Sequence, residues 1–211
     1  MLDQDLLLTP GERRRCAELR HPADRDARVA AHLLVRWAVA QLTGRPVEGL
    51  ELVQRCPDCA ATDHGRPAIA GSRLHVSLAH ARGAVVVGAH SRPVAVDVER
   101  TTPGAAAASR SLVLTDAESR RVHRAADPDR EFLHHWVLKE CLVKLGISTL
   151  DTVGGLEVPA GRPRRVAGGR TLGRQGRLHL ADWFDETLDA VVGVAGVRPP
   201  LVRSFPRRPQ G

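Results

Sequence analysis

The chain has 211 residues, 43% hydrophobic and 26% charged, which is typical of a soluble globular protein with a core of its own. Its formal net charge of +7 favours a negatively charged partner, but charge alone does not choose among nucleic acid, a phosphorylated small molecule, an anionic membrane and an acidic protein. Aromatic residues make up only 3%, which argues against a single-stranded nucleic acid site because such sites stack bases on aromatic rings.

The N-terminal segment has no features of a secretion signal. Acidic residues precede its short apolar run, and no small-residue cleavage site follows. No apolar run reaches the ~20 residues that span a membrane. We therefore expect a cytoplasmic protein with no membrane partner, whose four cysteines are reduced thiols.

Two helices are expected first. Thr9 and Glu12 have the spacing of a capping box, which predicts a helix that begins near Pro10. Apolar residues recur at helical spacing over residues 24–42, which predicts a second helix with Trp37 in the core.

Strands are expected next. Residues 50–55 form one, and residues 74–79 and 84–89 form a hairpin whose turn begins at His80. Residues 94–99 form a further strand that ends in acidic residues. The chain therefore changes from helices to an antiparallel sheet within its first hundred residues.

Cys56 and Cys59 form a C-x-x-C pair with His64 nearby, which has two interpretations. One is a pair of zinc ligands, but a structural zinc site needs four ligands and the chain has no second C-x-x-C. The other is a turn that carries two reduced thiols.

The strand over residues 94–99 carries two carboxylates on one face, because side chains of Asp97 and Glu99 are two positions apart. Neighbouring carboxylates repel each other, and a divalent cation would offset this repulsion since hard cations take oxygen ligands. The alternative is a solvated strand end with Arg100 as the counterion.

Residues 136–144 are expected to form a helix that ends at Gly146, with Trp136, Glu140 and Lys144 along one face. Of the 31 basic residues in the chain only Lys139 and Lys144 are lysines. A lysine is a compact point charge, which suits contact with a phosphate in a tight site. The alternative is an ordinary exposed pair of Glu140 and Lys144.

Similar segments recur about half a chain apart. Residues 112–121 repeat the L-x-L-T-x-x-E pattern of residues 6–15, again with capping-box spacing. We therefore predict an α+β fold made by pseudo-twofold duplication, in which each of two similar halves packs helices on a small antiparallel sheet. The N-terminal half (1–101) carries the D-x-E strand, the C-terminal half (102–198) carries the W-x-x-K-E helix, and residues 199–211 form a tail.

The acids of the first half and the helix of the second are expected to meet between the halves, since such interfaces form natural clefts. Asp97, Glu99 and Glu140 would then supply three carboxylates for Mg²⁺, with Lys139 and Lys144 nearby as cations. This set suits phosphoryl-group chemistry and leaves kinases, nucleases and other transferases open.

The sequence resembles the Sfp-type 4′-phosphopantetheinyl transferases. That family has a strand ending in D-x-E and a later helix W-x-x-K-E-x-x-x-K, which match VAVDVE (94–99) and WVLKECLVK (136–144) here. HGRP (64–67) and HVSLAH (75–80) are similar to two further family segments. The resemblance covers roughly residues 6–195. Ala79 stands where the family usually has Ser, and Cys141 where Ala or Ser is commoner.

The resemblance implies Mg²⁺-dependent transfer of 4′-phosphopantetheine from coenzyme A (CoA) to a serine of an acyl or peptidyl carrier protein, with release of 3′,5′-ADP. Asp97, Glu99 and Glu140 would hold the metal, and Glu140 and Lys144 would be catalytic. The residues that would bind CoA are Arg13, Arg15, Arg28, Arg66, Pro67, His80 and Lys144.

A duplicated chain would supply both halves of the site by itself, so we expect a monomer. The resemblance implies carrier-protein activation, as in secondary metabolite biosynthesis, and it leaves the pathway open. A positive rim would speed the encounter with the acidic face of a carrier protein. Two other classes stay possible: a metal-dependent enzyme acting on nucleic acid, and a non-catalytic binding module in which the acids and lysines form structural ion pairs.

Overall fold

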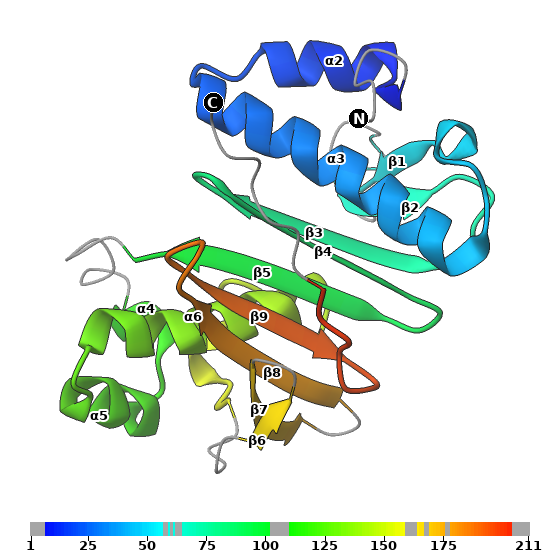
Figure 1. The fold of residues 1–211 in the computed structure, drawn as a ribbon. Coiled ribbons are helices and arrows are strands. Elements are labelled where there is room, and N and C mark those ends of the chain that lie inside the picture. The colour runs from blue at the N-terminus through cyan, green and yellow to red at the C-terminus, as the bar shows by residue number, and fades with distance from the viewer. Residues whose placement is uncertain are drawn as a thin grey trace.

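The computed structural model describes residues 7–56, 59, 61, 65–101, 110–158, 164–166, 169–175 and 178–203. The fold is α+β, as the sequence predicts, with helices packed on two small antiparallel sheets (Figure 1). The strand orders are β1-β2-β3-β4 in one sheet and β5-β9-β8-β7-β6 in the other. Within these ranges no helix combines the length and the hydrophobicity needed to cross a membrane. The pseudo-twofold duplication stays a prediction.

Two helices open the described chain, and both begin and end where local chemistry favours it. Helix α2 (Pro10–Ala17) has the predicted capping box, in which the Thr9 hydroxyl accepts from the Glu12 N–H and the Glu12 carboxylate accepts from the Thr9 N–H. Helix α3 (Pro22–Thr43) ends at Gly44, whose φ of 69° lies in the left-handed region that glycine adopts without strain.

The prediction that Trp37 lies in the core is wrong, because α3 presents a neighbouring face to the interior. Its fully buried apolar positions include Ala31, Val35 and Val39, whereas Trp37 is only half-buried. Arg36 is 0% exposed because Glu12 binds its guanidinium. A buried ion pair therefore sets the rotation of the helix, and apolar periodicity does not reveal such a pair.

The first sheet contains β1 (Leu52–Arg55), β2 (Arg66–Ile69), β3 (His75–Ala81) and β4 (Ala84–His90). The hairpin of β3 and β4 is present as predicted, but its turn is tighter than predicted. His80 belongs to β3 and pairs with Val85, so the expectation that His80 opens the turn is wrong.

The second sheet begins with the strand that carries the D-x-E motif, β5 (Val94–Arg100). Its hydrogen-bonded neighbour is the last strand of the chain, with Asp97 directly opposite Gly193. It also lies against β3 of the first sheet, where the Val96 N–H donates to the Ser77 hydroxyl at 3.1 Å. The other strands of this sheet are β6 (Arg164–Val166), β7 (Gly169–Gln175), β8 (Leu178–Asp185) and β9 (Ala190–Gly196).

Between β5 and β6 the described residues form helices α4 (Arg110–Val113), α5 (Asp116–Arg124) and α6 (Pro128–Lys144). Helix α5 has the second predicted capping box. Helix α6 is followed by Gly146, whose φ is 74°, close to the predicted end. Single 3₁₀ turns lie at Val47–Gly49 (η1) and Val153–Gly155 (η2).

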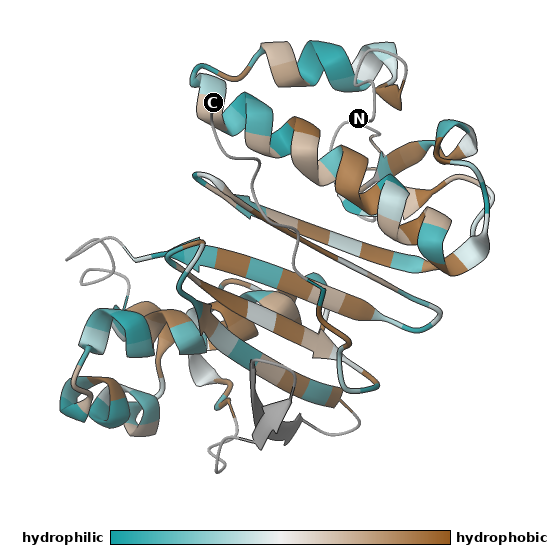
Figure 2. Ribbon diagram, in the orientation of Figure 1, coloured by the Kyte–Doolittle hydropathy of each residue, from teal (hydrophilic) through white to brown (hydrophobic). Residues whose placement is uncertain are grey.

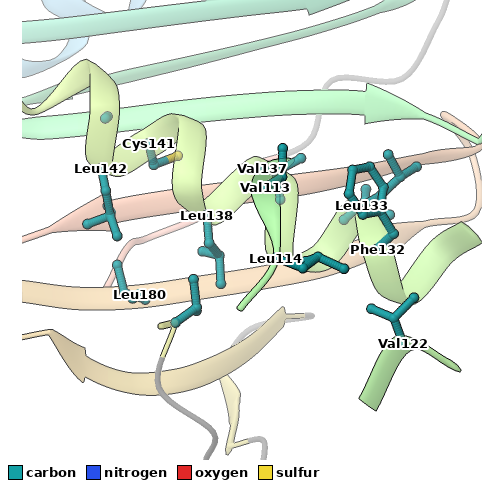
Figure 3. Packing of buried hydrophobic residues seen from close by; sticks show 14 residues of the cluster. Val113, Leu114, Val122, Phe132, Leu133, Val137, Leu138, Cys141, Leu142 and Leu180 are labelled. Carbon is teal, nitrogen blue, oxygen red and sulfur yellow. The ribbon is translucent and has the colours of Figure 1, made fainter. Parts of the chain in front are cut away.

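The largest core cluster joins α6 to the second sheet. Figure 3 shows Leu138 and Leu142 of α6 extending toward Leu180 of β8, and all three side chains are 0% exposed. Figure 2 shows hydrophobic residues concentrated on the strands, whereas α5 is mostly hydrophilic. A smaller cluster contains residues of β3, β4, β5 and β9, so apolar packing joins the two sheets beside the D-x-E strand.

Candidate active site

The D-x-E strand and the W-x-x-K-E helix face each other. Trp136, Glu140 and Lys144 are four residues apart and so share one face of α6. From that face the Lys144 ammonium donates to the Asp97 carboxylate at 2.7 Å and to the Val96 carbonyl at 2.9 Å. Two signatures separated by about forty residues therefore meet through an ion pair.

The other acid of the strand, Glu99, is held from the same helix. The Trp136 indole N–H donates to the Glu99 carboxylate at 3.4 Å. Trp136 also stacks on Phe132, with ring centroids 6.5 Å apart. The sequence places Trp136 on the same helix face as Glu140, and this spacing of four residues was the signal for its contact with Glu99.

Burial raises the pKa of all three carboxylates, and repulsion by Asp97 adds to this effect at Glu99 and Glu140. Asp97 is 6% exposed, and its pKa rises because burial outweighs the favourable effect of Lys144. Burial and the negative charge of Asp97 raise the pKa of Glu99, and they also raise that of Glu140. The ionised site therefore carries negative charge that Lys144 only partly offsets.

The two structural alternatives from the sequence do not describe this site. Arg100 binds the Asp189 carboxylate at 3.2 Å and the Arg82 carbonyl at 3.0 Å, so it is not the counterion of the D-x-E pair. Lys144 pairs with Asp97 of the neighbouring strand rather than forming an exposed pair along its own helix.

The donor chemistry of the three acids fits a hard divalent cation. The Asp97 Oδ2 atom is buried and accepts no hydrogen bond within the described part of the chain. Carboxylate oxygens that repel one another are the ligands such cations take. The structure does not, however, arrange three or more His, Cys, Asp or Glu side chains around one point anywhere among the described residues. The fit thus rests on the buried oxygen and on charge.

Lys139 does not lie at this site, so the prediction that places it beside Lys144 as a nearby cation is wrong. Its side chain is 0% exposed, and its ammonium donates to the Glu118 carboxylate and the Val113 carbonyl, both at 2.6 Å. Adjacent residues of a helix point about 100° apart. With Glu140 on the face toward β5, Lys139 is directed toward α4 and α5.

His80 and Arg28 come together from different elements. Burial lowers the pKa of the His80 imidazole, and the positive charge of Arg28 on α3 lowers it further. The charges of Asp24 and Lys144 also act on His80, so charged residues of both α3 and α6 lie within electrostatic range of this ring. The positive charges of Arg28 and Lys144 near this ring suit an anionic group.

Arg66 reaches the end of α6 from the first sheet. Its side chain is exposed, and a Cβ atom added to Gly146 would lie 2.5 Å from its guanidinium. Gly146 therefore allows this close approach. Pro67 is half-buried and pairs with Gln54 in the β1–β2 ladder.

The arginines of α2 lie at the other edge of this region. Arg13 is exposed, and its guanidinium donates to the Leu8 carbonyl. Arg15 is half-buried, and its carbonyl accepts from the Arg28 guanidinium at 3.4 Å. Arg15 and Arg28 are thus adjacent.

The C-x-x-C pair is only partly described. Cys56 is buried and Cys59 is exposed. His64, which the zinc interpretation uses, lies outside the described residues. Both interpretations of the pair therefore stay open.

Comparison with known proteins gives a distant similarity. No protein-family model matches the chain. It is 22% identical over 135 residues to a 4′-phosphopantetheinyl transferase of Bacillus subtilis. The match covers 63% of this chain and 57% of that protein, so the chain spans less than two thirds of the curated relative. This distant homologue supports the family to which the two sequence signatures point, the 4′-phosphopantetheinyl transferases.

Proposed function

We propose that the protein transfers 4′-phosphopantetheine from CoA to a serine of an acyl or peptidyl carrier protein and releases 3′,5′-ADP. The observation that carries this proposal is the contact of the D-x-E strand with the W-x-x-K-E helix through Lys144 and Asp97. The distant similarity to a phosphopantetheinyl transferase supports the same reaction.

The acids and the lysine divide the chemistry between them. Burial and the charge of Asp97 raise the pKa of Glu140, which makes this carboxylate a stronger base for the serine proton. The serine oxygen forms a bond to the phosphorus that carries pantetheine, and the bond from that phosphorus to the 3′,5′-ADP oxygen breaks. The Lys144 ammonium would stabilise negative charge on the transferring phosphate.

A magnesium ion is part of the proposal. Asp97, Glu99 and Glu140 would hold it, and the buried Asp97 Oδ2 atom supports this assignment. When bound, Mg²⁺ would neutralise charge on the pyrophosphate of CoA. Without a cation, the charge of Asp97 repels Glu99 and Glu140 and raises the pKa of both.

The CoA-binding residues are proposed along a path from α2 to α6. Arg28 and His80 would contact the 3′-phosphate, because they lie within electrostatic range of each other and of Lys144. Arg66 and Pro67 would border the adenine, and Arg15 and Arg13 would contact outer phosphates. We propose further that the protein acts as a cytoplasmic monomer and binds the acidic face of its carrier protein.

Release of 3′,5′-ADP tests the reaction. The protein is mixed with CoA, Mg²⁺ and each of several apo-carrier proteins, and the nucleotide products are separated by ion-exchange chromatography. We expect 3′,5′-ADP only when a carrier protein and Mg²⁺ are both present. Release without a carrier would indicate CoA hydrolysis, and absence of release with every carrier, together with absence of CoA binding in calorimetry, would reject the proposal.

The two other classes make different predictions in the same experiments. An enzyme that acts on nucleic acid would bind DNA or RNA with strong salt dependence. A non-catalytic module would show no Mg²⁺-dependent binding of CoA and would tolerate Asp97→Ala.

A further inference from the structure

Each half of the described chain contains a buried glutamate from a capping box. Glu12 of α2 is 1% exposed and Glu118 of α5 is 0% exposed. In both helices the glutamate accepts from the N–H of the capping threonine, at 2.7 Å for Glu12 and 2.9 Å for Glu118. An exposed capping box would need no further partner, so burial of both carboxylates calls for a cation.

The cation comes from the following helix in both cases. Arg36 of α3 donates to Glu12 at 2.7 Å, and Lys139 of α6 donates to Glu118 at 2.6 Å. A histidine lies four residues before each cation: His32 contacts Glu12 at 2.8 Å, and His135 lies 3.6 Å from Glu118. We call these two sets the paired anchors.

Each cation of the paired anchors also binds carbonyl oxygens of other segments. Lys139 donates to Val113 at the end of α4 at 2.6 Å and to Val153 of η2 at 3.3 Å. Arg36 donates to Leu50 after η1 at 2.9 Å. Each helix is therefore fixed in rotation by a side chain bound to at least two other parts of the chain.

The residue after each cation differs between the halves. Trp37 follows Arg36, whereas Glu140 follows Lys139. The anchor is thus common to both halves, and the acid beside β5 occurs only in the second. The same ion-pair geometry occurs before Trp37 and before Glu140. The role of Lys139 is therefore distinct from the chemistry at Glu140.

We propose that Lys139 and Arg36 are matched positioning residues: Lys139 holds α6 so that Glu140 and Lys144 face β5, and Arg36 holds α3 so that Arg28 faces His80. The catalytic part of this proposal rests on the proposed phosphopantetheine transfer. Lys139 belongs to the signature helix but contacts neither carboxylate of the D-x-E strand, because Glu118 binds its ammonium inside the protein.

The paired anchors predict opposite kinetic effects for two equivalent substitutions. Lys139→Met should lower kcat by about 100-fold, because misplacement of a catalytic group by ~1 Å costs that much, and should change the KM for CoA less than about threefold. Arg36→Met should raise the KM for CoA by about tenfold and leave kcat within about threefold, because α3 carries a proposed CoA contact. Both variants should lose roughly 10 °C in Tm.

Hydrogen exchange measures the anchors without any substrate. Lys139→Met should speed exchange of amides in α6 more than in α3, and Arg36→Met should do the reverse. If Lys139→Met does not fold, Lys139→Arg serves instead, because it keeps the positive charge. We expect this variant to fold with a smaller loss of kcat, because a planar guanidinium replaces the compact ammonium.

Equal loss of Tm with kcat and KM unchanged in both variants would show that the anchors only stabilise the fold, and would overturn the proposal. Amide hydrogen exchange that speeds up equally in α3 and α6 in both variants would also overturn the proposal. If the unchanged protein transfers no phosphopantetheine, the proposed function fails, and hydrogen exchange still decides whether each cation holds its own helix.

Discussion

At the residue scale, the main feature is a group of three carboxylates whose charges are unfavourable in the folded chain. Burial raises the pKa of Asp97, and burial together with the charge of Asp97 raises that of Glu99 and Glu140, above the ordinary values of 3.8 for Asp and 4.5 for Glu. A raised folded-state pKa contributes stability that is present at low pH and is lost as the pH rises through that pKa. At neutral pH these acids therefore destabilise the protein when no cation is bound.

The destabilising effect of these charges at neutral pH can be tested at Glu140. We expect Glu140→Gln to raise Tm by ~2 °C in EDTA at pH 7, because it removes one repelling charge. The same variant should lose the rise in Tm that Mg²⁺ gives the unchanged protein, and its transfer rate should fall by at least about 100-fold. Thermal unfolding with and without Mg²⁺ measures the first two effects. A lower Tm in EDTA would contradict the account.

Residues of the site could be predicted where they recur at the regular spacing of one strand or one helix. Two-residue alternation placed Asp97 and Glu99 on one face, and four-residue spacing placed Trp136, Glu140 and Lys144 on another. The same spacing could not show that Lys139 points into the protein, because its partner Glu118 lies 21 residues away in the chain. Long-range ion pairs of this kind leave no periodic signal.

At the element scale, the distance between α6 and its sheet depends on a glycine. Gly193 of β9 lies opposite Asp97, and a Cβ atom added there would lie 2.8 Å from a methyl carbon of Val137 and 2.9 Å from its carbonyl carbon. These distances are shorter than ordinary van der Waals contact. The helix can therefore approach β5 closely only because this position has no side chain.

We predict that Gly193→Ala lowers the free energy of unfolding by about 1–3 kcal/mol, because it overpacks the contact of α6 with β9. Transfer activity should fall as well, since the helix must shift away from Asp97. Gly155→Ala is the matched control, because an added Cβ at that position meets no atom within 4 Å. Urea unfolding of both variants measures the difference; equal stability of the two would show that α6 does not need this close approach.

The anchor of α3 makes the protein sensitive to acid. Burial alone would raise the pKa of Glu12, but hydrogen bonds from His32 and Arg36 lower it from 4.5 to about 2. A lowered pKa contributes stability that is complete above the unfolded-state value and is lost as the pH falls toward the folded-state value. The contribution is roughly 3 kcal/mol for a shift of this size.

The corresponding test compares the unchanged protein with Glu12→Gln over a range of pH. At pH 7 the variant should be less stable by about 3–5 kcal/mol, because Arg36 keeps its charge inside the protein without a carboxylate. The difference in the free energy of unfolding between the two proteins should narrow by roughly 3 kcal/mol between pH 5 and pH 2. Urea unfolding at several pH values measures it, and a gap that does not change with pH would contradict the assigned ion pair.

Several helices and strands could be predicted from local signals, whereas the rotation of α3 and the pairing of β5 could not. Both capping boxes and the glycine at the end of α6 lie where the sequence places them. The rotation of α3 could not be predicted, because it depends on the ion pair of Arg36 with Glu12. Alternation predicts a strand at β5 but does not select β9 as its neighbour.

At the scale of the whole molecule, the D-x-E strand connects the two sheets. Strand β5 is hydrogen-bonded to β9, yet its Val96 N–H donates to Ser77 of β3 (Figure 1). The candidate site therefore includes residues of α3, β3, β5 and α6, which neither half would supply alone. The division into halves at residues 101 and 102, and their pseudo-twofold relation, stay predictions.

The central claim is that the interface of β5 and α6 transfers phosphopantetheine to a carrier protein. The most direct measurement is the intact mass of an apo-carrier protein after incubation with this protein, CoA and Mg²⁺. We predict a mass gain of one phosphopantetheine group that disappears with EDTA and with Glu140→Gln. No gain on any carrier from several pathways, under conditions where the protein is folded and binds CoA, would contradict the claim.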